Sequence, residues 1–128
     1  IMEFRVARHT NQLDEIRRFY TTIFEFEILG EFKNHNNYDG IFIGKPHFDW
    51  HLEFTTSNDE ANHHSDEDDC LVFYPQNQQE YNTIIENLEK FQLKPIKAKN
   101  PYWNENGITI LDPDGFHIII SPLKITNI

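Results

Sequence analysis

Hydrophobic residues recur at two periods along the chain, and each period predicts a kind of element. In the first half, Leu13, Ile16, Tyr20 and Ile23 are three or four positions apart, which predicts an amphipathic helix ending near Phe24. Strand-like runs occupy residues 4–7, 27–32, 40–44 and 50–56. The first half therefore reads as a strand, a helix and three strands.

The second half repeats this order. Tyr81, Ile84, Leu88 and Phe91 have the spacing of the first helix face and predict a second amphipathic helix. The expected strands are residues 70–74, 94–98, 107–111 and 116–121, and the last two are joined by the Asp-Pro-Asp-Gly sequence of a tight turn. We infer an internal duplication that is visible in element order more than in residue identity.

A polar segment separates the two halves. Residues 57–69 carry six acidic side chains and no aliphatic residue larger than Ala61, as expected of a solvated connector. We therefore expect an α+β protein with a first module over residues 1–56, a connector over 57–69 and a second module over 70–128. At 128 residues, the two modules fit one structural domain.

Strand alternation sorts side chains onto two faces of each predicted sheet. One face is apolar and should lie against the helices: Phe4, Val6, Leu52, Phe54, Leu71, Phe73, Ile118 and Ile120. The other mixes polar and small apolar groups: Arg5, Ala7, His51, Glu53, Thr55, Cys70, Val72, Tyr74, His117, Ile119 and Ser121. Such a mixed inner face suits a pocket for a small-molecule ligand, whereas the alternative is that it is simply solvated.

Charge and cysteine content narrow the class of partner. The net charge of -10 repels phosphate backbones and anionic lipids, so we expect neither nucleic acid nor a membrane as a partner. The single cysteine, Cys70, cannot form an internal disulfide, and the chain shows no secretory signal pattern. These features predict a cytoplasmic protein. No apolar run approaches the roughly 20 residues of a membrane-spanning helix.

Three segments together resemble a known superfamily. The run from Leu13 to Tyr20, the strand from His51 to Phe54 and the turn before Phe116 are similar to the vicinal oxygen chelate superfamily, which includes glyoxalase I, bleomycin-resistance proteins and extradiol dioxygenases. Residues 38–40 and 100–103 resemble YycE-like bacterial proteins in particular. The resemblance implies two βαβββ modules whose curled half-barrel sheets surround a shared cavity, with the helices outside. It also implies a homodimer.

In the superfamily's enzymes, the resemblance implies a divalent metal held by His, Gln and Glu on the inner faces. Here the first position is Arg5, the second is Glu53, the third is Cys70 or Asp69, and the fourth is Ile119. Only Glu53 matches. Because Arg carries a permanent positive charge, we expect no metal cofactor and predict that Arg5 pairs with Glu53 instead.

Other inner-face and loop residues leave alternatives open. His51 and His117 could join Glu53 in a different metal site, or each could bond locally in a polar cavity. Tyr102 and Trp103 are adjacent aromatics in an expected loop, where they either line the pocket or cap the core. The expected ligand-binding residues are Arg5, His51, Glu53, Tyr74, Tyr102, Trp103 and His117.

Three functions are compatible with this sequence. The first is a metal-free protein that binds a small organic molecule. The second is a metal-dependent lyase, isomerase or dioxygenase with Glu53, His51 and His117 as ligands. The third is a metal-free enzyme in which Glu53, His51 or His117 acts as a general base. Metal content discriminates the second function from the other two.

Overall fold

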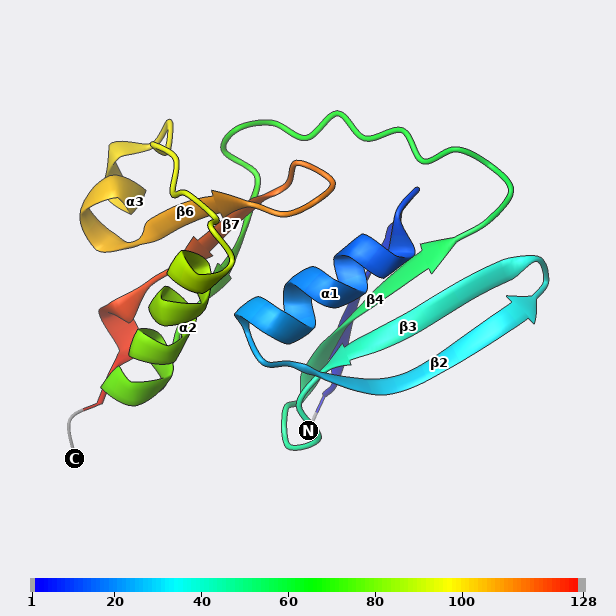
Figure 1. Cartoon of the computed structure of the whole chain (residues 1–128), viewed down its shortest axis with the longest axis horizontal. Helices are drawn as coiled ribbons and strands as arrows, with labels where there is room; N and C mark the ends of the chain where they lie inside the picture. The colour runs from blue at the N-terminus through cyan, green and yellow to red at the C-terminus, as the bar shows by residue number, and fades with distance from the viewer. Residues whose placement is uncertain (1, 127–128) are drawn as a thin grey trace. The chain divides into compact units, whose positions relative to one another are not determined.

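The computed structural model describes residues 2–126, and the chain divides between His63 and His64 into two compact units. Each unit combines one small sheet with helices, so the protein is α+β as predicted (Figure 1). Among the described residues, no helix has the length and apolar character needed to cross a membrane.

The first unit is a four-stranded sheet with one helix lying across it (Figure 1). Its elements are β1 (Phe4–His9), α1 (Leu13–Ile23), β2 (Glu27–His35), β3 (Tyr38–Gly44) and β4 (Trp50–Thr56). The strand order is β1-β4-β3-β2, with β1 parallel to β4 and the other neighbours antiparallel. The predicted order of strand, helix and three strands is confirmed.

Helix α1 forms because its apolar residues fall on one face. Ile16, Tyr20 and Ile23 of the predicted face are buried, together with Phe19. The Tyr20 ring stacks on the Phe54 ring of β4, with 5.1 Å between centroids. The first unit therefore has its core between α1 and one face of β3 and β4.

Strand β1 is at an edge of this sheet, and that position corrects one expectation. Phe4 and Val6 share a face with Leu52, but they are 64% and 37% exposed, whereas Leu52 is 4% exposed. Helix α1 packs on β3 and β4, so it does not cover the edge strand. Side-chain alternation was predicted correctly for β1, but burial was not.

The second unit is a three-stranded sheet with two helices and a final helical turn. Its elements are β5 (Cys70–Phe73), α2 (Gln78–Lys90), α3 (Pro101–Asn106), β6 (Ile108–Leu111), β7 (His117–Ile120) and the 3-10 turn η1 (Pro122–Lys124). The strand order is β5-β7-β6, with β5 parallel to β7 and β6 antiparallel to it. Leu71 and Phe73 are half-buried, whereas Ile118 and Ile120 are fully buried.

Local sequence signals set the ends of α2 and the last turn. Asn77 caps α2 because its side-chain oxygen accepts a hydrogen bond from the Glu80 amide at 2.8 Å. In the turn between β6 and β7, the Asp112 side chain accepts bonds from the amides of Asp114 and Phe116. Gly115 has a φ of 85°, a backbone conformation that favours glycine. The predicted turn is confirmed.

The predicted strand over residues 94–98 is wrong. Only Ile96 pairs, in an isolated bridge to Thr109. Two residues further on, the Asn104 side chain donates to the carbonyl of Ala98 and accepts from its amide, at 2.9 and 2.8 Å. A side chain therefore takes the place of a neighbouring strand, and the second module has three strands instead of four.

The predicted loop at residues 100–103 is also wrong, since it opens helix α3. Asn100 caps the helix by accepting a bond from the Tyr102 amide at 3.0 Å, and Pro101 occupies the first turn, where its missing N–H costs nothing. The Asn-Pro pair is a helix-start signal. From sequence alone, the segment is predicted to be a loop because its two adjacent aromatics interrupt the strand pattern.

Candidate functional site

An ion pair between Arg5 and Glu53 is the central polar feature of the first unit. The two residues come from neighbouring strands, with Arg5 opposite His51 and Ala7 opposite Glu53 in the register of β1 and β4. Arg5 Nε lies 3.4 Å from Glu53 Oε1, and the Glu53 side chain is 13% exposed against 52% for Arg5. A shielded carboxylate is therefore neutralised by a more exposed guanidinium, as the sequence predicted.

Aromatic rings surround this ion pair. The Arg5 guanidinium lies 5.7 Å from the centre of the Phe42 ring. The centre of the Phe42 ring is 5.6 Å from that of His51 and 5.8 Å from that of Phe32. We call these five residues, Arg5, Phe32, Phe42, His51 and Glu53, the Glu53 face. Sequence analysis missed Phe42. Alternation along β3 puts its side chain on the face of the sheet away from the buried Ile41 and Ile43.

Gly40 gives the Glu53 face its shape. A methyl group at Gly40 would overlap the Phe32 ring, so the ring lies where a side chain on β3 would otherwise stand. Phe32 and Phe42 are only half-buried in this arrangement. The result is an apolar surface beside a charged pair, which can contact both the flat and the polar parts of an organic molecule.

Two of the four positions where the resemblance implies metal ligands carry side chains that do not fit a divalent cation. Arg5 brings a positive charge to the first position, and Ile119, at the fourth, is 2% exposed and has no donor atom. Within residues 2–126, no group of three or more His, Cys, Asp or Glu side chains is arranged to hold a metal ion. The alternative ligands His51 and Glu53 lie in the first unit, whereas His117 lies in the second.

A small hollow in the second unit brings together other predicted residues. Its volume is about 20 Å³, and it is lined by Glu67, Asp68, Cys70, Ala98, Asn100, Trp103, Thr109, His117 and Ile119. We call it the Thr109 hollow. His117 and Trp103 were predicted as ligand-binding residues, but Thr109 was missed. The available signal was a polar residue between Ile108 and Ile110, which alternation places on the face opposite Ile110.

The Cys70 thiol in this hollow is held in its protonated form. Burial raises the pKa of Cys70 above its ordinary value of 9.0, and the negative charges of Asp68 and Asp69 raise the pKa further. A thiolate is the reactive form of cysteine, so these surroundings oppose nucleophilic chemistry at Cys70.

Two predicted residues lie apart from the Thr109 hollow. Tyr74 follows the end of β5, is 42% exposed and has its ring 5.8 Å from the Lys124 ammonium. Tyr102 is 50% exposed and packs edge-on against Trp103 at 4.9 Å. Neither residue lines the hollow.

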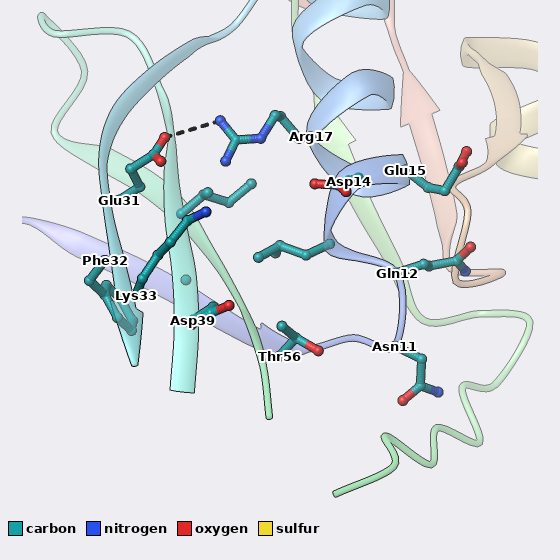
Figure 2. Close-up of a pocket in the computed structure, with 13 residues that line it drawn as sticks. Asn11, Gln12, Asp14, Glu15, Arg17, Glu31, Phe32, Lys33, Asp39 and Thr56 are labelled. Atoms are coloured by element: carbon teal, nitrogen blue, oxygen red, sulfur yellow. Dashed lines mark hydrogen bonds and ion pairs between the residues drawn. The ribbon is translucent and has the colours of Figure 1, made fainter. Parts of the chain in front are cut away.

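A larger groove opens between α1 and the strands β2 and β3 (Figure 2). It has a volume of about 490 Å³, and sequence analysis did not predict it. Figure 2 shows Arg17 reaching from α1 towards Glu31 on β2, and their charged groups pair at 3.1 Å. Because these charges are partly solvated and bind each other, this ion pair is a weak anchor for a ligand.

Comparison with known proteins identifies relatives along nearly the whole chain. Residues 4–55 match the YycE-like N-terminal domain family, and residues 68–121 match the YycE-like C-terminal domain family. The YycE protein of Bacillus subtilis (strain 168) is 42% identical over 126 residues, which cover 95% of this chain and 88% of that protein.

Solved structures agree with the sequence matches. The crystal structure of Bacillus subtilis YycE superposes with a TM-score of 0.83 at 41% identity, covering 98% of this chain and 91% of that one. Leishmania major glyoxalase I superposes with a TM-score of 0.68 at 17% identity, covering 91% of this chain and 83% of that one. The fosfomycin resistance protein FosX of Mesorhizobium loti superposes with a TM-score of 0.66 at 11% identity, covering 91% of this chain and 87% of that one. The chain therefore belongs to the YycE-like family and has the fold of the vicinal oxygen chelate superfamily.

Proposed function

We propose that this protein binds a small organic molecule on the Glu53 face without a divalent metal. The observation that carries the proposal is the 3.4 Å ion pair between Arg5 and Glu53, at positions where the superfamily's enzymes hold a cation. A guanidinium beside the carboxylate supplies the positive charge that a metal would otherwise bring. The fold supports the proposal at a general level, because related structures include glyoxalase and fosfomycin resistance proteins.

The chemistry of the Glu53 face indicates the kind of ligand. Phe42, Phe32 and His51 offer ring surfaces that stack on a flat apolar group. Arg5 is half exposed and directs its Nε towards Glu53, which leaves its terminal N–H groups to bind an acceptor such as a carboxylate. An aromatic carboxylate satisfies both requirements.

Benzoate is a direct probe of this proposal. We expect benzoate to shift the NMR resonances of Arg5, Phe42 and His51, and cyclohexanol to shift them at least tenfold more weakly at equal concentration. Arg5→Met should abolish the response because it keeps an unbranched apolar stem and removes the donors. The matched control is Arg18→Met, which removes an exposed guanidinium of α1.

Two outcomes would contradict the proposal. The first is that benzoate binds equally well to the wild type and to Arg5→Met. The second is that binding depends on added nickel, zinc or manganese, which would favour the metal-dependent lyase, isomerase or dioxygenase instead.

A further inference from the structure

Two buried polar atoms in the second unit have no hydrogen-bond partner among the residues that the structure describes. They are Thr109 Oγ1 and His117 Nδ1. Thr109 is 2% exposed, so water from the open surface does not solvate its hydroxyl. Native proteins rarely leave such atoms unpaired, because burial removes their bonds to water without replacing them.

Both residues line the Thr109 hollow and come from adjacent strands. In the register of β6 and β7, Thr109 faces Ile119 and Leu111 faces His117, so Thr109 and His117 are diagonal neighbours on one face of the sheet. Diagonal neighbours are about 7–8 Å apart at their backbones. That spacing suits two side chains that bond to one shared atom between them.

The size and charge of the hollow limit what that shared atom is. A volume of about 20 Å³ accommodates one water molecule or one polar group of a larger molecule. Glu67 and Asp68 line the same hollow and disfavour an anion. A metal ion is also disfavoured, because no set of three ligating side chains occurs within the described part of the chain.

We propose that the Thr109 hollow is a hydrogen-bonding subsite for one neutral oxygen atom. In the free protein this oxygen belongs to water, and in the bound protein it is the hydroxyl or carbonyl oxygen of a small organic ligand. The Thr109 hydroxyl can donate and accept, and the His117 ring nitrogen does either according to its tautomer, so the pair matches both kinds of oxygen. The proposal is argued from residues of the second unit alone and goes beyond the proposed function, which concerns the first unit.

The first test is a crystal structure that resolves ordered water. In the wild type we expect one oxygen within hydrogen-bond distance of Thr109 Oγ1 and His117 Nδ1. In crystals soaked with isopropanol, the alcohol oxygen should take that position. Thr109→Val keeps the side-chain size but removes the hydroxyl, so the oxygen should be lost, whereas Thr109→Ser should retain it.

The second test measures binding in solution. Isopropanol should shift the ring nitrogen resonances of His117 in the wild type and in Thr109→Ser, and the shift should fall at least fivefold in Thr109→Val. The matched control is Thr55→Val on β4 of the first unit, which should leave the His117 response unchanged.

The proposal is overturned if the wild-type hollow is empty, if protein rearrangement pairs both atoms, or if Thr109→Val binds the oxygen as the wild type does. Failure of the proposed function looks different. In that case benzoate has no effect on Arg5 and Phe42, while water and isopropanol still occupy the hollow.

Discussion

The Glu53 face and the Thr109 hollow differ in whether their shielded polar groups have bonding partners. On the Glu53 face, a carboxylate that is 13% exposed has a guanidinium 3.4 Å away. In the Thr109 hollow, a hydroxyl and an imidazole nitrogen are buried without a partner among the described residues. The first region pairs its shielded charge within the fold, and the second leaves two buried polar atoms without a partner among the described residues.

The cost of burial explains this difference. An uncompensated buried charge costs several kcal/mol, whereas a neutral polar group without a partner costs roughly 1–3 kcal/mol. The fold therefore has to supply a counter-charge for Glu53, but it can leave Thr109 and His117 for water or a ligand.

Ile119→Glu should have the largest effect on the free energy of unfolding. This change places a carboxylate at the position where the resemblance implies an acid, and the Ile119 side chain there is 2% exposed. We expect a loss of about 3 kcal/mol in the free energy of unfolding at pH 8. The loss should be smaller at pH 5, since burial raises the pKa of a carboxylic acid and favours its neutral form. Urea denaturation measures both values.

Ile119→Val is the control for lost packing and should cost about 1 kcal/mol at either pH. Equal stability of Ile119→Glu and Ile119→Val at pH 8 would mean that this unit tolerates a buried charge without a counter-charge, which would contradict the explanation from the cost of burial.

A double-mutant cycle on the Glu53 face should give a smaller effect. Arg5→Met and Glu53→Gln each remove one charge, and we expect a coupling free energy of about 1 kcal/mol that decreases as salt is added. The estimate is low because the Arg5 side chain is 52% exposed.

The exposed pair Arg18 and Glu15 provides the matched comparison. Their charged groups lie 3.2 Å apart, with exposures of 66% and 57%, so the same cycle should give about 0.3 kcal/mol. A coupling at Arg5 and Glu53 no larger than this would show that the shielding of Glu53 has no energetic consequence.

The contribution of Cys70 to the pH dependence of stability should be the smallest of these effects. Because the folded pKa of the thiol is raised above 9.0, the unfolded state loses its proton first as pH rises. Stability should therefore fall as pH rises from 9.0 through the folded pKa, and it should not change from this cause at lower pH.

The measurement is the difference in unfolding free energy between the wild type and Cys70→Ser across pH 8 to 11. Asp68→Asn combined with Asp69→Asn should reduce the fall, since those charges contribute to the raised pKa. A stability that rose with pH in the wild type relative to Cys70→Ser would reverse the sign and contradict the assignment.

Sequence periodicity predicted the parts of the fold that depend on local pattern. Alternation in β1 and β4 placed Arg5 and Glu53 on one face, and helical spacing identified Ile16, Tyr20 and Ile23 as core residues. These predictions succeed because the direction of a side chain follows from its own backbone.

Features that depend on distant residues could not be predicted in this way. The exposure of Phe4 follows from the place of β1 at the sheet edge, and the loss of the strand at residues 94–98 follows from the Asn104 side chain. Thr109 carried a weak signal, but its lack of a partner depends on which groups surround it in space. Topology and side-chain contacts decide such features.

Calorimetric titration of the chelator-treated protein with manganese, nickel and zinc tests the central claim most directly. The same titration of Glu53→Gln separates binding on the Glu53 face from weak binding by the acidic connector, residues 57–69. We predict that the wild type and Glu53→Gln give the same weak heats, because Arg5 already neutralises the carboxylate. One equivalent of metal bound tightly by the wild type and lost in Glu53→Gln would contradict the account.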